Sequence, residues 1–280
     1  MTTLSQGLRD FGYVDGENIL LIYRSAEKGL DTLPALASEL IRRPIDVLYA
    51  VGPAAVWAAT KATKTVPIVA VDLESDPVAN GWIRSLPSPG GNLTGFFLDF
   101  PDLAAKWLQL LREADAELKE IGVLWDSTTG RAQLDAVTRA AQGSGIGLQL
   151  IPIKSVSDLD QAISAAASNR AKALLLLSSP IFDSRSSQIA ALVLKSQLPA
   201  ISPFRRFAEQ GGLMAYGPDL QEFFRAAPAI IAKIIEGRMP SELPVQQPTK
   251  FYLVINLKTA KLLGLQLRQA LLIRANEVIQ

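Results

Sequence analysis

The chain has 280 residues, of which 49% are hydrophobic and 20% are charged. This length exceeds the usual size of one domain and the apolar content excludes a disordered protein, so we expect two folded domains. The 28 Lys and Arg residues against 27 Asp and Glu residues give a net charge of +1, which provides no basic face for nucleic acid or for an anionic membrane.

Cysteine and histidine are both absent. Their absence excludes thiolate nucleophiles, disulfides, zinc sites built on Cys or His, and Ser-His-Asp triads. The pairs Gly90-Gly91 and Gly211-Gly212 lack GxGxxG spacing, and no P-loop is present. The sequence therefore predicts no cofactor and no metal site, and it argues against an enzyme, although carboxylate or lysine chemistry stays open.

Short apolar runs alternate with amphipathic stretches up to about residue 255, which is typical of βαβ units and a mostly parallel sheet. The chain opens in a helix at residues 4–11. The run 173–177 does not alternate, as expected for a strand covered by helices on both faces. Strands are predicted at residues 19–24, 47–51, 68–71, 121–125, 148–153, 173–177, 200–202, 213–216 and 251–255, with helices between them that include residues 33–41, 134–141 and 220–235.

Two proline-rich passages are candidate crossings between the domains. Residues 87–101 contain Pro-Ser-Pro-Gly-Gly-Asn and the uncharged run 93–98, and we interpret them as the first crossing. Residues 238–250, with three prolines, carry the chain across again. The predicted N-terminal lobe comprises residues 1–95 and 220–240, and the predicted C-terminal lobe comprises residues 96–219 and 241–280.

Six sequence blocks, spread over nearly the whole chain, carry a family resemblance. They are QGLRDFGYVDGENI at 6–19, DPV at 76–78, PGGNLTG at 89–95, GGLMAYGPDL at 211–220, QPTKF at 247–251 and VINLKTAK at 254–261. With these blocks in this order, the sequence resembles the substrate-binding proteins of ABC transporters, of the tryptophan-uptake type. One block alone would be weak, whereas the ordered set is specific.

The resemblance implies a type I periplasmic-binding fold, with two doubly wound parallel-sheet lobes joined by three crossovers. It implies a receptor that closes on a small amino-acid-like or aromatic ligand in the interlobe cleft and docks on an ABC permease. It also implies a place outside the cytoplasmic membrane, either periplasmic or lipid-anchored, as a monomer or weak dimer. The alternative is a cytoplasmic ligand-sensing regulatory domain of the same fold, which the lack of a recognisable signal peptide suits and the lack of a helix-turn-helix does not.

One departure from the family pattern concerns the first strand. Family members usually begin with an export signal and a strand whose following loop lines the cleft, and this sequence starts after both. Since that strand lies between the next two in the type I fold, residues 19–24 and 47–51 are expected to lack a neighbour. They can pair directly, accept a segment from another copy, or belong to a longer natural protein; we favour the last.

Candidate ligand contacts follow the predicted strands, because open α/β sheets bind ligands beyond the carboxyl ends of their strands. In the predicted N-terminal lobe, Gly52, Pro53 and Ala54 form a turn into a helix whose free N–H groups suit a ligand carboxylate. Asp76 belongs to a stretch of three carboxylates, 72–78, that suits a ligand ammonium. The alternatives are an ordinary strand-to-helix turn and a helix cap by Asp76.

In the predicted C-terminal lobe, aromatic and small polar residues follow the strands. Asp126 is either a ligand contact or an N-cap. Phe182 and Phe204 have rings that suit stacking on a flat ligand, or they are core residues. Tyr216 and Asp219 flank a Gly-Pro turn, where a hinge and a ligand contact predict the same residues. The candidates here are Asp126, Ser179, Phe182, Phe204, Tyr216 and Asp219.

Overall fold

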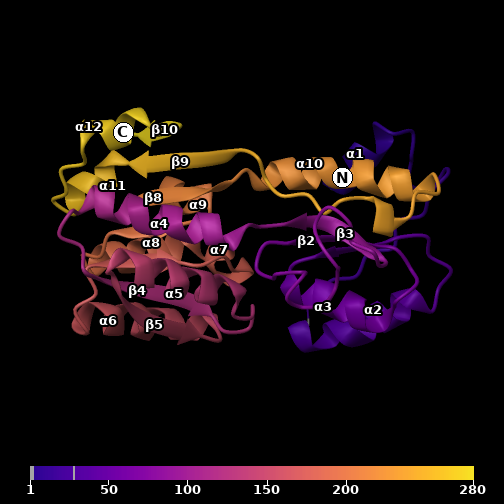
Figure 1. The fold of residues 1–280 in the computed structure, drawn as a ribbon, viewed down its shortest axis with the longest axis horizontal. Coiled ribbons are helices and arrows are strands. Elements are labelled where there is room, and N and C mark those ends of the chain that lie inside the picture. The colour runs from indigo at the N-terminus through magenta and orange to yellow at the C-terminus, as the bar shows by residue number, and fades with distance from the viewer. Residues whose placement is uncertain (1–2, 28) are drawn as a thin grey trace. The chain divides into compact units, whose positions relative to one another are not determined.

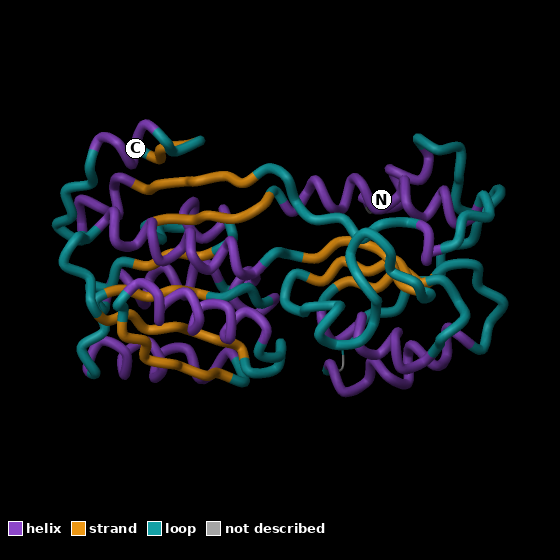
Figure 2. The backbone as a smooth tube through the Cα atoms, in the orientation of Figure 1, coloured by secondary structure: helices purple, strands orange, loops and turns teal. Residues whose placement is uncertain are grey.

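The computed structural model describes residues 3–27 and 29–280, and the chain divides into two compact units. Unit 1 comprises residues 1–98 and 219–248, and unit 2 comprises residues 99–218 and 249–280. The chain therefore passes between the units three times, as the family resemblance implies. Figure 1 identifies the elements of each unit, and Figure 2 shows the strands of each unit side by side.

Unit 1 is built on a three-stranded parallel sheet in the order β1 (Leu48–Val51), β2 (Ile68–Asp72) and β3 (Leu93–Phe97). All residues of the central strand β2 are buried. Helix α3 (Pro53–Ala62) packs on β1 and β2 and against α2 (Leu33–Ile41), whereas α10 (Leu220–Ile235) packs on β2 and β3 and against α1 (Thr3–Arg9). Helices thus cover both faces of this sheet (Figure 1).

The packing of α1 on α10 depends on a small residue. A side chain added at Gly7 of α1 would lie 2.5 Å from Cγ of Pro228, which sits inside α10. The two helices approach each other closely at this point, although more than 200 residues separate them in the sequence. Short 3-10 helices at Leu30–Thr32 and Pro240–Glu242 complete unit 1.

Unit 2 is built on a seven-stranded sheet in which β8 and β9 are antiparallel and all other neighbours are parallel. Along the sheet the strands are β10 (Glu277–Ile279), β9 (Phe251–Asn256), β8 (Met214–Pro218), β7 (Ala200–Ser202), β6 (Ala173–Leu176), β4 (Glu120–Asp126) and β5 (Gly147–Ile153). Every residue of β6 is buried, as its non-alternating sequence predicts.

Helices of unit 2 pack on its sheet and on one another. Among them, α4 packs against α5, and α8 packs against both α6 and α9. The apolar core joins Leu124 and Leu174 of the strands to Ile163 of α6, Ile189 of α8 and Phe207 of α9. The helices are α4 (Phe100–Ala114), α5 (Ala132–Ser144), α6 (Leu159–Ser168), α7 (Pro180–Ser184), α8 (Ser186–Lys195), α9 (Arg205–Glu209), α11 (Leu257–Leu262) and α12 (Gln269–Ile273), with a 3-10 turn at Val156–Asp158.

Residues 19–24 do not form the predicted strand. Leu20 and Tyr23 are 75% and 77% exposed, and the segment is held through side chains: Leu21 N donates to Asp15 Oδ1, and Arg24 pairs with Glu39. The apolar sequence predicts a strand, but a strand exists only where a neighbour pairs with it. In the described part of the chain, β1 is consequently the edge of its sheet.

The first passage between the units falls between residues 98 and 99, within the predicted crossing at 87–101. The uncharged run inside that range is not a linker, because it forms β3, which is fully buried beside β2. Residues 241–248 were assigned to the C-terminal lobe, but their contacts lie in unit 1. Val245 N donates to Leu86 O, Gln246 N donates to Gly95 O, and Leu243 O accepts from Thr94 Oγ1. The strand β10 was not predicted.

Candidate functional site

The carboxyl end of the unit 1 sheet begins with a turn after β1. Gly52 has φ +86° and directly precedes α3, with Pro53 at the first helical position and Ala54 following. Gly52 N donates to Val71 O, so the turn is fixed to β2. The first N–H groups of a helix have no partner inside it. Gly52, Pro53 and Ala54 therefore form the strand-to-helix turn that the sequence predicts, and their contact with a ligand stays a prediction.

Asp72 ends the central strand of unit 1 and is fully buried, at 0% exposure. Its Oδ1 accepts hydrogen bonds from Glu74 N at 2.9 Å and Ser75 N at 3.0 Å. Its Oδ2 has no hydrogen-bond partner, the one such buried side-chain atom among the described residues. Burial raises the pKa of Asp72, against the opposing effect of hydrogen bonds with Ser75 and Glu74.

The neighbouring acids differ from Asp72 in their surroundings. Glu74 is also buried, at 3% exposure, and its Oε2 accepts a hydrogen bond from Leu73 N. Asp76 is less buried, and its Oδ1 accepts from Val78 N and Ala79 N. Asp76 thus caps the backbone turn at residues 77–81. The sequence offered a helix cap as the alternative to ligand contact; the capping is present, but no helix begins there.

In unit 2 a hydrogen-bonded pair fixes the loops after β4 and β6. Asp126 is 1% exposed and Ser179 is fully buried. Ser179 Oγ donates to Asp126 Oδ2 at 2.6 Å and accepts from Ile181 N, while Thr128 N and Oγ1 both donate to Asp126 Oδ1. Asp126 caps no helix, because α5 begins only at Ala132. Its carboxylate is satisfied by its own loops.

Phe182 and Phe204 differ from the stacking surfaces that the sequence suggests. Phe182 is 1% exposed and packs in the core of unit 2, so it is a core residue, which was the alternative to stacking on a ligand. Phe204 is 5% exposed and directly precedes α9.

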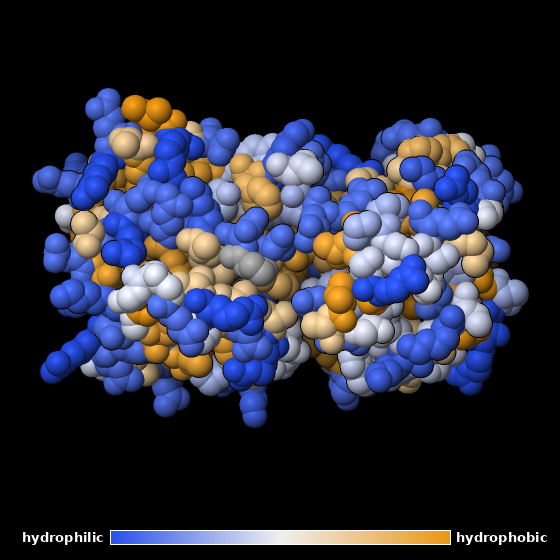
Figure 3. Space-filling view, viewed as in Figure 1, coloured by the Kyte–Doolittle hydropathy of each residue, from blue (hydrophilic) through white to orange (hydrophobic). Residues whose placement is uncertain are grey.

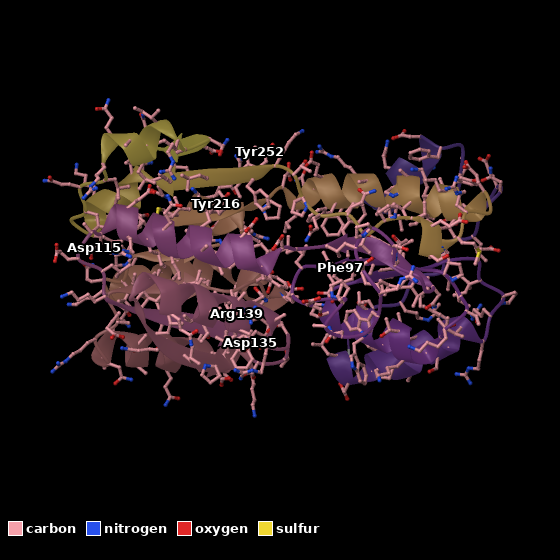
Figure 4. All side chains as sticks on the ribbon, in the orientation of Figure 1. Phe97, Asp115, Asp135, Arg139, Tyr216 and Tyr252 are labelled. Atoms are coloured by element: carbon pink, nitrogen blue, oxygen red, sulfur yellow. The ribbon has the colours of Figure 1, made fainter. Side chains whose placement is uncertain are left out.

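Tyr216 lies in the middle of β8, and Asp219 directly follows that strand. Tyr216 stacks on Phe251 of β9 at 5.8 Å between ring centroids, and its carbonyl accepts from Trp107 Nε1. Burial raises the pKa of Tyr216. Figure 4 shows Tyr216 near Tyr252 on the paired strands β8 and β9. Asp219 is the N-cap of α10 and accepts from Gln221 N.

Gln133 and Asp72 are not among the candidates selected from the sequence. Gln133 of α5 donates through Nε2 to Ser178 O and accepts from Ser178 N, so a buried amide holds the loop after β6. Asp72 was counted among the three carboxylates of its segment but not chosen, because burial and an unpaired oxygen are not visible in sequence. Its position directly after the apolar run 68–71 is the signal that the sequence offers.

Other parts of the surface do not coincide with these residues. A hollow of about 440 Å³ on unit 2 is lined by residues of α4 and α5 and by Arg268, away from the candidates above. The face that carries these helices shows apolar patches among hydrophilic residues (Figure 3). Within the described residues, no group of three His, Cys, Asp or Glu is placed to hold a metal ion, and no helix is long and apolar enough to cross a membrane.

A family model described as ABC transporter substrate binding protein matches residues 1–279. The chain belongs to this family. A tyrosine-binding protein of Clostridioides difficile (strain R20291) is 26% identical over 263 residues, which cover 93% of this chain and 75% of the relative. The match extends through both units, so the family assignment applies to the whole two-unit chain.

Solved structures confirm the type I periplasmic-binding fold. A conserved domain protein of Vibrio cholerae has a TM-score of 0.91 at 25% identity, and an ABC domain of Streptococcus pneumoniae in complex with L-Trp has a TM-score of 0.89 at 22% identity. Each comparison covers 99% of this substrate-binding protein and 93% of the solved chain. A ligand-free, open substrate-binding protein of Clostridium difficile has a TM-score of 0.70 at 24% identity.

Proposed function

We propose that this substrate-binding protein is the receptor of an ABC importer for an aromatic amino acid or a close analogue. The family match over residues 1–279 carries the proposal. The tyrosine-binding relative and the L-Trp complex of a structural neighbour support the ligand class. The match gives no support to the regulatory alternative.

The candidate residues suit such a ligand because they offer polar groups in both units and an aromatic ring, Tyr216, in unit 2. Asp72 is the last residue of β2 and precedes the loop that holds Asp76, and the turn at Gly52 directs helix N–H groups beyond β1. In unit 2, Asp126 ends β4, Ser179 lies in the loop after β6, and Tyr216 lies within β8. We propose that ligand binding stabilises one conformation of the receptor, which then docks on the permease outside the cytoplasmic membrane.

The receptor performs no chemistry on its ligand in this proposal. The chain contains no His and no Cys, which are the side chains most often used as general base and thiolate nucleophile. Movement of the ligand across the membrane is carried out by the transporter.

A thermal-shift screen with L-tryptophan, L-tyrosine and L-phenylalanine tests the proposal, with D-ribose and spermidine as controls of other classes. A ligand at 100 times its dissociation constant adds about 2.7 kcal/mol, which corresponds to a rise of about 5 to 10 °C in melting temperature. The bound amino acid should be recovered unchanged, as chromatography after prolonged incubation would verify. No shift with any aromatic amino acid would remove the proposed ligand class, and accumulation of a product would show an enzyme.

A further inference from the structure

Three buried polar side chains of unit 2 all have hydrogen-bond partners, as buried polar groups ordinarily do. Asp126, Gln133 and Ser179 are at most 2% exposed, and each has hydrogen-bond partners within its own unit. Asp72 is the exception. Its Oδ2 is buried without a hydrogen-bond partner, and none of the described lysines or arginines forms an ion pair with it.

An unpaired buried carboxylate is costly, because the group loses hydration without gaining a partner. Such a group persists where the cost is recovered by another partner. Asp72 does contribute to the local fold, since Oδ1 fixes Glu74 N and Ser75 N, but that role uses one oxygen only. An asparagine would fix the same two amides without a charge, so the loop alone does not explain the carboxylate.

The position of Asp72 in the sheet indicates what its second oxygen can bind. It is the last residue of the central strand β2 and lies between the ends of β1 and β3. In open parallel sheets this carboxyl edge is where ligands bind. The adjoining turn at Gly52 leads into the N-terminus of α3, which favours negative charge. An edge that offers a carboxylate and, one strand away, helix N–H groups is complementary to a zwitterion.

We propose that Asp72 binds the ammonium group of the ligand through Oδ2 and so selects amino acids over the corresponding acids. This inference rests on the proposed function, because it assigns a residue to the same ligand. Glu74 lies beside Asp72, and its Oε2 accepts a hydrogen bond from Leu73 N. Asp72 Oδ2 has no hydrogen-bond partner, so we assign this oxygen to the ligand. A charge-assisted hydrogen bond in a buried site is among the stronger polar contacts.

The test compares ligands with and without the amine by isothermal titration calorimetry. The probes are L-tryptophan and 3-indolepropionic acid, and L-tyrosine and 3-(4-hydroxyphenyl)propionic acid. The wild-type protein should prefer each amino acid over its deaminated partner on the order of 10- to 100-fold. In D72N the affinity for the amino acid should fall by a similar factor, while that for the deaminated acid stays the same or rises. The preference should therefore disappear.

Asp15→Asn is the matched control, because it removes the same charge from an exposed position of unit 1 whose Oδ1 accepts one backbone hydrogen bond, from Leu21 N. It should leave the preference unchanged. If D72N does not fold, Asp72→Ser replaces it, and the wild-type comparison stands without any variant. Equal binding of both members of a pair by the wild type overturns the inference, as does a preserved preference in the Asp72 variants. If the wild type binds none of the four probes, the proposed ligand class fails and the inference with it.

Discussion

A single hydroxyl in unit 2 connects two loops that are 53 positions apart in sequence. Ser179 Oγ donates to Asp126 Oδ2 and accepts from Ile181 N, and both Ser179 and Asp126 are buried. We expect Ser179→Ala to lower the free energy of unfolding by about 2 kcal/mol, because it leaves a buried carboxylate oxygen and a backbone N–H without partners. Urea denaturation followed by circular dichroism measures this change.

Ser184→Ala is the control for that substitution. Ser184 lies five residues away in α7, is exposed, and only donates to Ile181 O. Its loss should change stability by less than about 0.5 kcal/mol. Equal effects of the two variants would mean that the Ser179–Asp126 bond contributes nothing to the fold.

Residue roles were only partly predictable, since tertiary partners decide them. The sequence predicts polar residues at or after the carboxyl ends of strands, and the structure places Asp126 at the end of β4, Ser179 after β6 and Asp76 after β2. It offered N-capping as the alternative for Asp126, yet the partner of that carboxylate is a serine from the loop after another strand. Likewise, Asp72 and Asp76 differ in burial. The two residues are only four positions apart, and the sequence does not show which of them is buried.

Close packing of strands in unit 1 depends on Gly95 in the middle of β3. Its φ is +137°, and a side chain there would lie 2.0 Å from Ala70 O on β2. We expect Gly95→Ala to cost about 3 kcal/mol, because neither the backbone conformation nor the neighbouring strand can accept a Cβ without moving. Chemical denaturation of the purified variant measures the loss.

Gly143→Ala provides the opposite case within a helix. Gly143 lies in α5 with nothing within 4 Å of an added Cβ, and alanine is the better helix former, so stability should rise by about 0.5 kcal/mol. A Gly95→Ala protein as stable as the wild type would show that β2 and β3 adjust freely at this position.

Elements with a strong local pattern were predicted, and those defined by pairing were not. Helices α2, α5 and α10 and the strands β4, β5, β6 and β7 lie where periodicity and apolar runs place them. Residues 19–24 have a strand-like composition but pair with no strand. Residues 93–97 contain Thr94 and Gly95, yet they pair along their whole length with β2. Sequence pattern reports burial and propensity, whereas a strand also requires a neighbour to pair with.

Each unit has its own sheet and its own apolar core. The sheet of unit 2 has seven strands and that of unit 1 has three, with β1 at its edge in the described part of the chain. Small sheets with open edges bury less backbone and open at lower free energy. A two-unit chain also need not unfold in a single step. Unit 1 is therefore expected to open first.

Hydrogen exchange at increasing urea concentration tests this order, with peptides from each unit followed by mass spectrometry. Peptides covering β2 and β3 should lose protection at a lower urea concentration than peptides covering β4 and β6, because the larger sheet opens later. Helix α10 is the internal control: it follows β8 directly in the chain, yet it packs on β2 and β3. Its amides should therefore lose protection together with the unit 1 strands and before those of β8. Simultaneous loss in all peptides would mean that the two units unfold as one cooperative body, and exchange of α10 together with β8 would contradict its assignment to unit 1.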